Sequence, residues 1–242
     1  MKALLLAAGL GTRLRPYTDT TPKCLIEING QPLLDFWLEK LTAAGVGPFL
    51  VNTHYLYEQV ESHLRNGPFS AAVTLVREDE LLGTAGTLIK NIDFFADDDG
   101  LLMHADNFCM DDFHGFLQAH KDRPAECEMT MMAFKTKTPK SCGILELDSR
   151  GIVIGFHEKS ENPPGNRANG AIYLLSSTLL KRFRSDYAHC KDFSTEILPT
   201  LLGKIYAYET QAYFVDIGTP DTYREANIVA RKNKNNICRS AS

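Results

Sequence analysis

The stretch LLLAAGLGTRLRPYTDTTPKCL, residues 4–25, begins with an apolar run and continues into a glycine turn and several basic residues. The run from Ala3 to Ala8 shows no polar alternation, which predicts a strand that is covered on both faces. Gly9 and Gly11 follow this run, and glycines let the backbone approach a ligand and present successive N–H groups to an anion. The stretch therefore predicts an anion-binding loop directly behind the first buried strand.

Two common phosphate-binding motifs do not fit this loop. A Walker A motif needs a second glycine five residues after the first, and a dinucleotide-binding GxGxxG motif needs its third glycine at that same position. In this sequence the residue five positions after Gly9 is Leu14, so both motifs are excluded. A plain chain reversal would explain the glycines alone. The hydroxyl of Thr12 and the cations of Arg13 and Lys23 make a phosphate cradle the better interpretation.

The composition is that of an ordinary globular protein, with 44% hydrophobic and 23% charged residues. The net charge of −4 argues against a protein that coats nucleic acid or an anionic membrane. The six cysteines form no CxxC pair and no short metal-ligand spacing, which predicts reduced structural thiols. No stretch reaches the roughly 18 apolar residues of a membrane helix. We therefore expect a soluble, cytoplasmic protein that binds neither nucleic acid nor a membrane.

Strand and helix patterns alternate through the first part of the chain. Apolar runs predict strands at 3–8, 48–55, 71–76 and 100–106. Helical spacing of apolar residues predicts helices at 32–44, 57–64 and 84–92. This alternation predicts an α/β protein with a Rossmann-like, mostly parallel sheet flanked by helices.

The second part of the chain has closely spaced strand patterns instead. They fall at 127–134, 142–147, 151–156, 170–175 and 212–217, and helices are expected at 193–202 and 219–232. We predict one domain over residues 1–230, with a nucleotide half at about 1–110 and a smaller β-rich substrate half at about 111–230. Residues 231–242 are basic and carry no acid, which predicts a helix end and a frayed basic tail rather than a nucleic-acid-binding arm.

The opening stretch resembles the sugar-nucleotidyltransferase family, whose motif reads L-A-x-G-x-G-T-R-L-x-P and is followed by P-K. Here the motif runs from Leu6 to Pro16, and Pro22 and Lys23 form the second part. The resemblance implies the nucleotide-diphospho-sugar transferase fold and transfer of a nucleotidyl group from a nucleoside triphosphate to a sugar 1-phosphate. It also implies nucleotide contacts from Leu6, Ala8, Gly9, Gly11 and Thr12.

Two further segments resemble nucleotide and metal sites of the same family. LLGTAG, residues 81–86, resembles the nucleobase loop, which implies that Gly83 and Thr84 bind the nucleotide; a strand-to-helix turn would use these glycines equally well. In LLMHADNF, Asp106 matches the aspartate that holds Mg²⁺ against the nucleotide phosphates. His104 and Ala105 depart from the family pattern at this point, which leaves open how closely the nucleotide approaches.

The later segments resemble the second metal ligand and the sugar-phosphate site. In YFVDIGTP, Asp216 matches the second Mg²⁺ aspartate, although by itself it would be interpreted as a helix cap. The resemblance implies sugar-phosphate contacts from Glu158, Lys159, Asn169, Gly170 and Glu196. Taken alone, Glu158 and Lys159 would form an exposed surface pair, and the Asp-Phe-Ser segment before Glu196 could serve only as a helix cap.

The resemblance also implies how the catalytic residues divide the work. Arg13 would bind the triphosphate and the leaving pyrophosphate, Lys23 the α-phosphate, and Lys159 the attacking phosphate. Positioning and electrostatics would carry the reaction, because the attacking phosphate is already ionised and needs no general base.

The Leu-Gly-Thr-Ala-Gly form of the nucleobase loop resembles mannose-1-phosphate guanylyltransferases, so GTP and mannose 1-phosphate are the expected substrates. Four alternatives stay open. They are transfer to a heptose 1-phosphate, guanylyl or uridylyl transfer to another hexose 1-phosphate, cytidylyl transfer to a small phosphorylated substrate, and a catalytically silent regulatory subunit. A homodimer is also left open.

Overall fold

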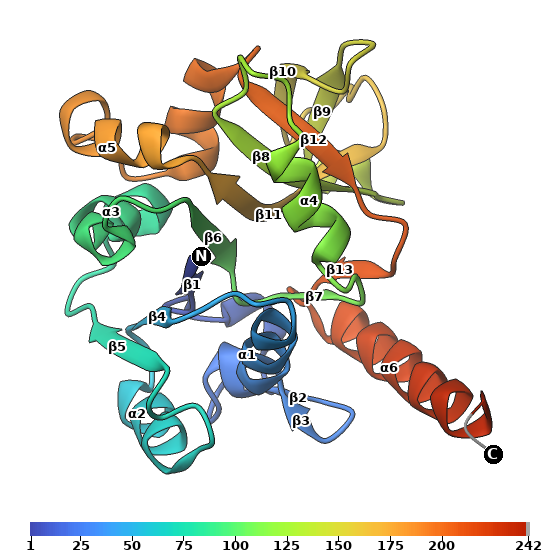
Figure 1. Cartoon of the computed structure of the whole chain (residues 1–242). Helices are drawn as coiled ribbons and strands as arrows, with labels where there is room; N and C mark the ends of the chain where they lie inside the picture. The colour runs from blue at the N-terminus through green and yellow to red at the C-terminus, as the bar shows by residue number, and fades with distance from the viewer. Residues whose placement is uncertain (241–242) are drawn as a thin grey trace.

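The computed structural model describes the backbone of residues 1–240 and the side chains of residues 1–233. Its central sheet consists of β1 (Lys2–Leu6), β4 (Phe49–Thr53), β5 (Val73–Arg77), β6 (Gly100–His104), β8 (Met129–Lys135), β9 (Gly143–Leu147), β10 (Val153–Glu158), β11 (Arg167–Leu175) and β12 (Ile205–Glu209). The order is β10-β9-β11-β6-β1-β4-β5, and β8 pairs with both β11 and β12 (Figure 1). Two short ribbons complete the strands, β2 (Glu27–Ile28) with β3 (Gln31–Pro32), and β7 (Asn107–Cys109) with β13 (Phe214–Asp216).

The four strands β6, β1, β4 and β5 run parallel to one another. Leu6, at the end of β1, is in register with Asn52 on one side and with His104 on the other. The carboxyl ends of these strands therefore meet at one edge of the sheet, where α/β proteins bind their ligands. This arrangement confirms the predicted Rossmann-like α/β class.

Helices cover both faces of the sheet: α1 (Leu33–Ala43), α2 (Tyr57–Asn66), α3 (Gly83–Lys90), α4 (His114–Lys121), α5 (Ser177–Asp186) and α6 (Pro220–Ser240). Successive residues of a strand point to opposite faces. Leu5 of β1 accordingly packs in the core with α1, α2, α4 and α6, whereas Leu4 packs in the second core with α3 and α5. Of the predicted strands, 3–8, 48–55 and 100–106 therefore form the buried middle layer, and 71–76 forms the less buried edge strand β5.

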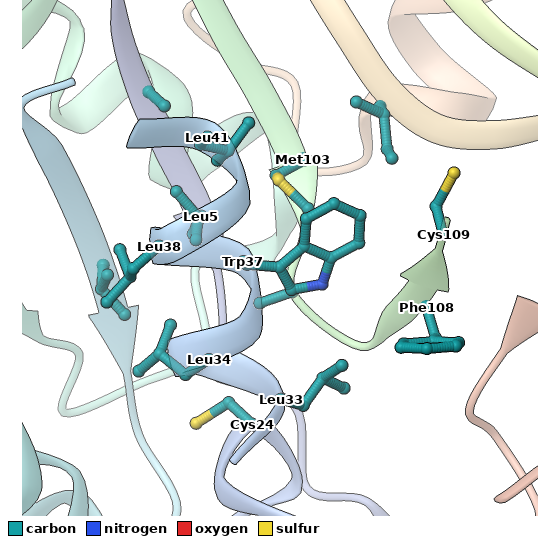
Figure 2. Packing of buried hydrophobic residues seen from close by; sticks show 14 of the residues in the cluster. Leu5, Cys24, Leu33, Leu34, Trp37, Leu38, Leu41, Met103, Phe108 and Cys109 are labelled. Atoms are coloured by element: carbon teal, nitrogen blue, oxygen red, sulfur yellow. The ribbon is translucent and has the colours of Figure 1, made fainter. Parts of the chain in front are cut away.

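Trp37 links the first core to the segment that follows β6. Its indole is fully buried and projects from α1 toward Met103 (Figure 2). The indole Nε1–H donates a 2.8 Å hydrogen bond to the carbonyl of Asn107. A buried indole N–H needs such a partner, and here the bond holds the residue next to Asp106 against α1.

The second half of the chain is built on antiparallel pairing. β9 and β10 form a hairpin around residues 148–151, as the sequence predicts. Asp148 accepts hydrogen bonds from the N–H groups of Arg150 and Ile152, and Gly151 has a φ of +79°, which favours glycine. β11 pairs with β6, β8 and β9, so it joins the two halves into one sheet.

Two predicted helices differ from those observed. The segment 193–202 is a π-helical turn over Phe193–Ile197 followed by a 3₁₀ turn over Leu198–Leu201, because Pro199 cannot donate an N–H to a regular helix. The prediction of a helix at 219–232 and a frayed tail from 231 is wrong in extent, since α6 continues to Ser240. No glycine or proline between Thr222 and Ser240 ends the helix earlier. Residues 241 and 242 lie outside the described part of the chain. In Figure 1, α6 extends away from the sheet.

The sequence patterns did not predict α4, α5 or β12. The five cysteines whose side chains are described are free thiols, four of them buried, as predicted, and Cys238 lies outside these side chains. No helix of the described residues has the length and apolar character required to cross a bilayer.

Candidate active site

A cavity of about 260 Å³ opens at the carboxyl ends of β1, β4 and β6. Seven residues that the sequence predicts to bind nucleotide or phosphate line it: Leu6, Ala8, Gly9, Lys23, Gly83, Thr84 and Asp106. His104 and Ala105, which depart from the family pattern, line it as well. The cavity is therefore built from five separate segments, at 6–9, 23–24, 52, 78–87 and 104–106.

The glycine loop borders the cavity through Gly9, whereas Gly11, Thr12 and Arg13 do not line it. Gly11 has a φ of +64°, and Thr18, which is fully buried, donates a 2.7 Å hydrogen bond from Oγ1 to its carbonyl. The N–H of Leu14 donates to the same carbonyl. Within the described part of the chain, the N–H groups of residues 9–13 have no hydrogen-bond acceptor. A run of free N–H groups can form an anion-binding nest, which is the role that the sequence analysis expects for this loop.

Lys23 and two aspartates meet beside this loop. Lys23 is 8% exposed, and its Nζ lies 2.5 Å from Asp106 Oδ2 and 3.7 Å from Asp216 Oδ1. Asp106 follows β6 and Asp216 ends β13, so two distant segments bring their carboxylates to one place. Arg13 is largely exposed, and its guanidinium lies 3.8 Å from Asp216 Oδ2.

The pKa values of the two aspartates move in opposite directions. Burial alone would raise the pKa of Asp106, but the Lys23 ammonium and the His104 ring outweigh it and hold this pKa below its usual range. Partial burial raises the pKa of Asp216, and repulsion from the Asp106 carboxylate raises it further. Lys23 and the more exposed Arg13 thus offset the charge of the two neighbouring carboxylates unequally, and Asp106 is the better compensated.

This donor set fits a Mg²⁺ ion. Mg²⁺ prefers oxygen ligands and is typically held by one or two carboxylates together with substrate phosphates. Asp106 and Asp216 supply two carboxylates from different strand ends, beside a loop that can hold phosphates. No group of three or more His, Cys, Asp or Glu side chains gathers around a possible ion position among the described residues. The protein would thus contribute these two carboxylates as ligands.

A buried polar network that the sequence analysis missed forms another wall of the cavity. Glu78 is 3% exposed, and its Oε1 accepts hydrogen bonds from Asn52 Nδ2 at 2.9 Å and Thr87 Oγ1 at 2.5 Å. Asn52 Oδ1 in turn accepts from the N–H of Ala7 at 2.9 Å. The available signal was Asn52 itself, a polar residue at the end of an apolar strand. The network ties the glycine loop to the segment before α3.

The predicted sugar-phosphate residues lie outside this cavity, on β10 and β11 and between α5 and β12. The Nζ of Lys159 lies 3.5 Å from Glu158 Oε1 and is largely exposed. Lys159 has a φ of +46°, and a non-glycine residue in this conformation is a recurrent feature of functional sites. Asn169 donates to the hydroxyl of Tyr173 at 2.7 Å, and the carbonyl of Gly170 accepts from Asn107 Nδ2 at 2.8 Å. Gly170 is thus tied to the residue after Asp106.

The carboxylate of Glu196 contacts its own turn. Its Oε2 accepts hydrogen bonds of 2.6 Å from the N–H groups of both Lys191 and Asp192. Asp192 Oδ1 accepts from the N–H of Thr195 at 2.7 Å, so the two acidic residues form a reciprocal cap. The hydrogen bonds from the Asp192 and Lys191 N–H groups hold the pKa of Glu196 below its usual range.

A donor-rich glycine loop, a buried lysine and two converging carboxylates beside the ends of parallel strands are typical of an α/β enzyme that binds phosphates. Residues 2–233 match the family model for nucleotidyl transferases, and the chain belongs to the nucleotidyl transferase family. It is 30% identical over 254 residues to a mannose-1-phosphate guanyltransferase of Schizosaccharomyces pombe, a match that covers all of this chain and 69% of that protein. Across the first relatives that it matches, the chain spans between 60% and 69% of their length.

Two solved structures share the fold. One is a putative glucose-1-phosphate thymidylyltransferase from Bacillus anthracis in complex with a sucrose, with a TM-score of 0.85 and 24% identity, covering 96% of this chain and 95% of that one. The other is HddC from Yersinia pseudotuberculosis complexed with GMP-PN, with a TM-score of 0.77 and 27% identity, covering 93% of this chain and 97% of that one. The match to the first structure confirms the fold that the family resemblance implied.

Proposed function

We propose that this chain transfers a nucleotidyl group from a nucleoside triphosphate to a sugar 1-phosphate, releasing pyrophosphate, with GTP and mannose 1-phosphate as the preferred pair. The observation that carries the proposal is the convergence of Lys23, Asp106 and Asp216 beside a loop of free backbone N–H groups. Both substrates are anions and repel each other. The Lys23 ammonium and the free N–H groups supply the positive charge and the hydrogen-bond donors that would hold them side by side. The name of the yeast relative supports the choice of substrates.

In this proposal, each basic group stabilises charge at one place on the reacting phosphates. The N–H groups of residues 9–13 and the guanidinium of Arg13 bind the triphosphate and the departing pyrophosphate. The ammonium of Lys23 binds the α-phosphate, which takes the place of its present carboxylate contact. Lys159 binds the phosphate of the sugar and aligns it for in-line attack. Preorganised charges of this kind account for most of the rate in phosphoryl-transfer enzymes.

Asp106 and Asp216 would hold a Mg²⁺ ion, which neutralises phosphate charge and orients the triphosphate. Without it, the two carboxylates would repel the substrate. The pKa of Asp216 is already raised by its neighbour Asp106. A divalent cation relieves that repulsion, so binding of the ion and of the nucleotide support each other.

Glu78 supports guanine as the base. Its Oε2 accepts one hydrogen bond, from the N–H of Leu82 at 3.2 Å, and keeps further acceptor capacity at the cavity wall. Guanine offers adjacent ring N–H and amino donors to such a carboxylate, whereas uracil and thymine offer a single ring N–H. The structure of a relative with GMP-PN fits the same choice.

The decisive experiment measures pyrophosphate release in the presence of Mg²⁺. GTP, UTP, dTTP, CTP and ATP are each combined with mannose, glucose, glucosamine and heptose 1-phosphates. We expect GTP with mannose 1-phosphate to exceed the other pairs. If another pair of nucleoside triphosphate and sugar 1-phosphate gives the highest rate, the proposed substrates would change but the proposed reaction would stand.

Arg13→Ala and Arg15→Ala form a matched pair for this assay. Arg15 is a neighbouring arginine whose guanidinium lies 3.2 Å from Asp19 on the surface, so its loss should leave turnover unchanged. Loss of Arg13 should reduce turnover by about 10²–10³-fold. Nucleotide binding by calorimetry without pyrophosphate release from any pair would favour the regulatory-subunit alternative, and the absence of both would contradict the proposal.

A further inference from the structure

The first turn of α3 is capped by a carbonyl from a distant part of the chain. Lys191 O accepts hydrogen bonds from the N–H groups of Ala85 at 2.9 Å and Gly86 at 3.4 Å. The first N–H groups of a helix have no partner within the helix and are available to an anion unless something else satisfies them. Here another segment satisfies two of them, so this helix end is not a free phosphate site.

The contact between the two segments is close and specific. The N–H of Phe193 donates a 2.7 Å hydrogen bond to Thr84 Oγ1. Gly83 has a φ of +79°, and a Cβ added there would collide with Lys191 O. Gly83 and Thr84 line the cavity, whereas Lys191 and Phe193 do not. Residues 191–196 therefore support the back of the loop that faces the nucleotide.

Glu196 determines the shape of this supporting turn. Its Oε2 accepts hydrogen bonds from the N–H groups of Lys191 and Asp192. These groups directly precede the two that contact α3, the carbonyl of Lys191 and the N–H of Phe193. The other end of the turn is anchored by Phe193 and Ile197, which are almost completely buried in the same core as Ala85. With one end packed and the other held by Glu196, the turn presents Lys191 O at a fixed position.

We propose that Glu196 is a positioning residue for the nucleoside triphosphate and acts through the turn 191–193 on the loop that carries Gly83 and Thr84. The inference rests on the proposed nucleotidyl transfer and changes the role that the family resemblance implied for Glu196, which was contact with the sugar phosphate. Glu196 does not line the nucleotide cavity, so an effect on nucleotide binding must be transmitted through the backbone contacts described above.

The test compares Glu196→Ala and Glu196→Gln by calorimetric titration with GTP and, separately, with mannose 1-phosphate, together with KM for each substrate. We expect Glu196→Ala to weaken GTP binding about tenfold, equivalent to about 1.4 kcal/mol. Binding of mannose 1-phosphate should change less than twofold. Glu196→Gln should recover part of the GTP affinity, because its amide oxygen can still accept one N–H.

Three further variants separate positioning from misfolding. Thr84→Val removes the acceptor for the Phe193 N–H and should reproduce the loss of GTP affinity, while Thr84→Ser keeps a hydroxyl and should restore it. Glu61→Ala, which removes only a surface pair with Arg65, is the control for loss of a helical carboxylate. Thermal unfolding of each variant shows whether the fold is retained.

The outcomes are distinct. If mannose 1-phosphate binding weakens in Glu196→Ala while GTP binding is unchanged, Glu196 is a sugar-phosphate ligand and the inference is overturned. Equal weakening of both substrates would overturn it as well, because the effect would then be general. If the wild-type chain binds neither GTP nor mannose 1-phosphate, the result contradicts the proposed function itself and not only the role of Glu196.

Discussion

Lys23 donates a 2.5 Å hydrogen bond from Nζ to Asp106 Oδ2 and thereby occupies the space between two carboxylates. The second carboxylate, Asp216 Oδ1, lies 3.7 Å from the same nitrogen. A buried ammonium with two anionic neighbours is held where a divalent cation would also be attracted. In the proposed function, a Mg²⁺ ion would therefore compete with the lysine for the aspartates until a phosphate binds the lysine.

This competition makes a prediction for Lys23→Ala. The two carboxylates would then face each other with only the exposed Arg13 beside Asp216, so the variant should unfold at a lower temperature without metal and gain more stability from Mg²⁺ than the wild type does. Thermal unfolding with and without Mg²⁺ measures both effects. Lys137→Ala, which removes an exposed lysine, serves as the control. An equal gain from Mg²⁺ in Lys23→Ala and the wild type would argue against a metal site at these aspartates.

Asp106→Asn and Asp216→Asn test the same site by activity. Each change keeps the side-chain volume but removes the negative charge that would hold the ion. We expect turnover to fall by about 10²–10³-fold while the far-ultraviolet circular dichroism stays unchanged. Chelation of the metal should abolish pyrophosphate release by the wild type. Full activity in either variant would remove the metal assignment from that residue.

Thr18 should affect nucleotide binding although it lies behind the glycine loop. Thr18→Val removes the hydrogen bond to the carbonyl of Gly11 but nearly preserves the volume of the side chain. We expect a loss of about 1 kcal/mol in stability and about fivefold in GTP affinity, because the N–H groups are no longer held toward the cavity. Thr18→Ser retains the hydroxyl and should bind GTP more tightly than Thr18→Val. Equal affinities in the two variants would contradict this role.

Two predictions concern Lys159, one about binding of the sugar phosphate and one about the stability cost of its backbone conformation. Its φ of +46° costs an L-residue about 1 kcal/mol, and glycine does not have this cost. Lys159→Gly should therefore be about 1 kcal/mol more stable than Lys159→Ala, although both should lose binding of the sugar phosphate. Urea unfolding and steady-state kinetics with varied mannose 1-phosphate measure the two properties. A Lys159→Ala variant with wild-type KM for the sugar would exclude the proposed phosphate contact.

Stability should depend on pH through His120. Burial, reinforced by the charge of Arg123, lowers the pKa of His120 to about 4 from its ordinary 6.5. The unfolded chain therefore binds a proton between these values that the native protein does not, so stability falls as the pH falls from 6.5 toward 4. The total loss is on the order of 3 kcal/mol.

Urea unfolding of the wild type and of His120→Gln at pH 7, 6 and 5 checks this. The glutamine variant lacks the titrating ring, so its disadvantage relative to the wild type should shrink as the pH is lowered. A disadvantage that stays constant from pH 7 to pH 5 would mean that folding leaves the pKa of His120 unchanged, and one that grows would mean that Asp99, whose Oδ2 lies 3.4 Å from Nε2, stabilises the protonated ring.

Much of the nucleotide half could be predicted because its signals are local. An unalternating apolar run such as Ala3–Ala8 forms a buried strand wherever two helical layers cover it. Gly9 and Asp106 follow two such strands, and residues in these positions reach the same sheet edge. The structure places both in one cavity.

The sequence by itself thus determined the parallel sheet, the glycine loop and the positions of the charged residues along the chain. Only the tertiary structure decided which of them meet. Glu196 caps a turn that supports Thr84, and Glu78 joins Asn52 inside the cavity wall. The residues of these contacts come from separate elements, and Thr84 and Phe193 are 109 positions apart. Local patterns encode strands, helices and turns through backbone geometry, whereas a hydrogen bond between distant segments depends on how whole layers pack.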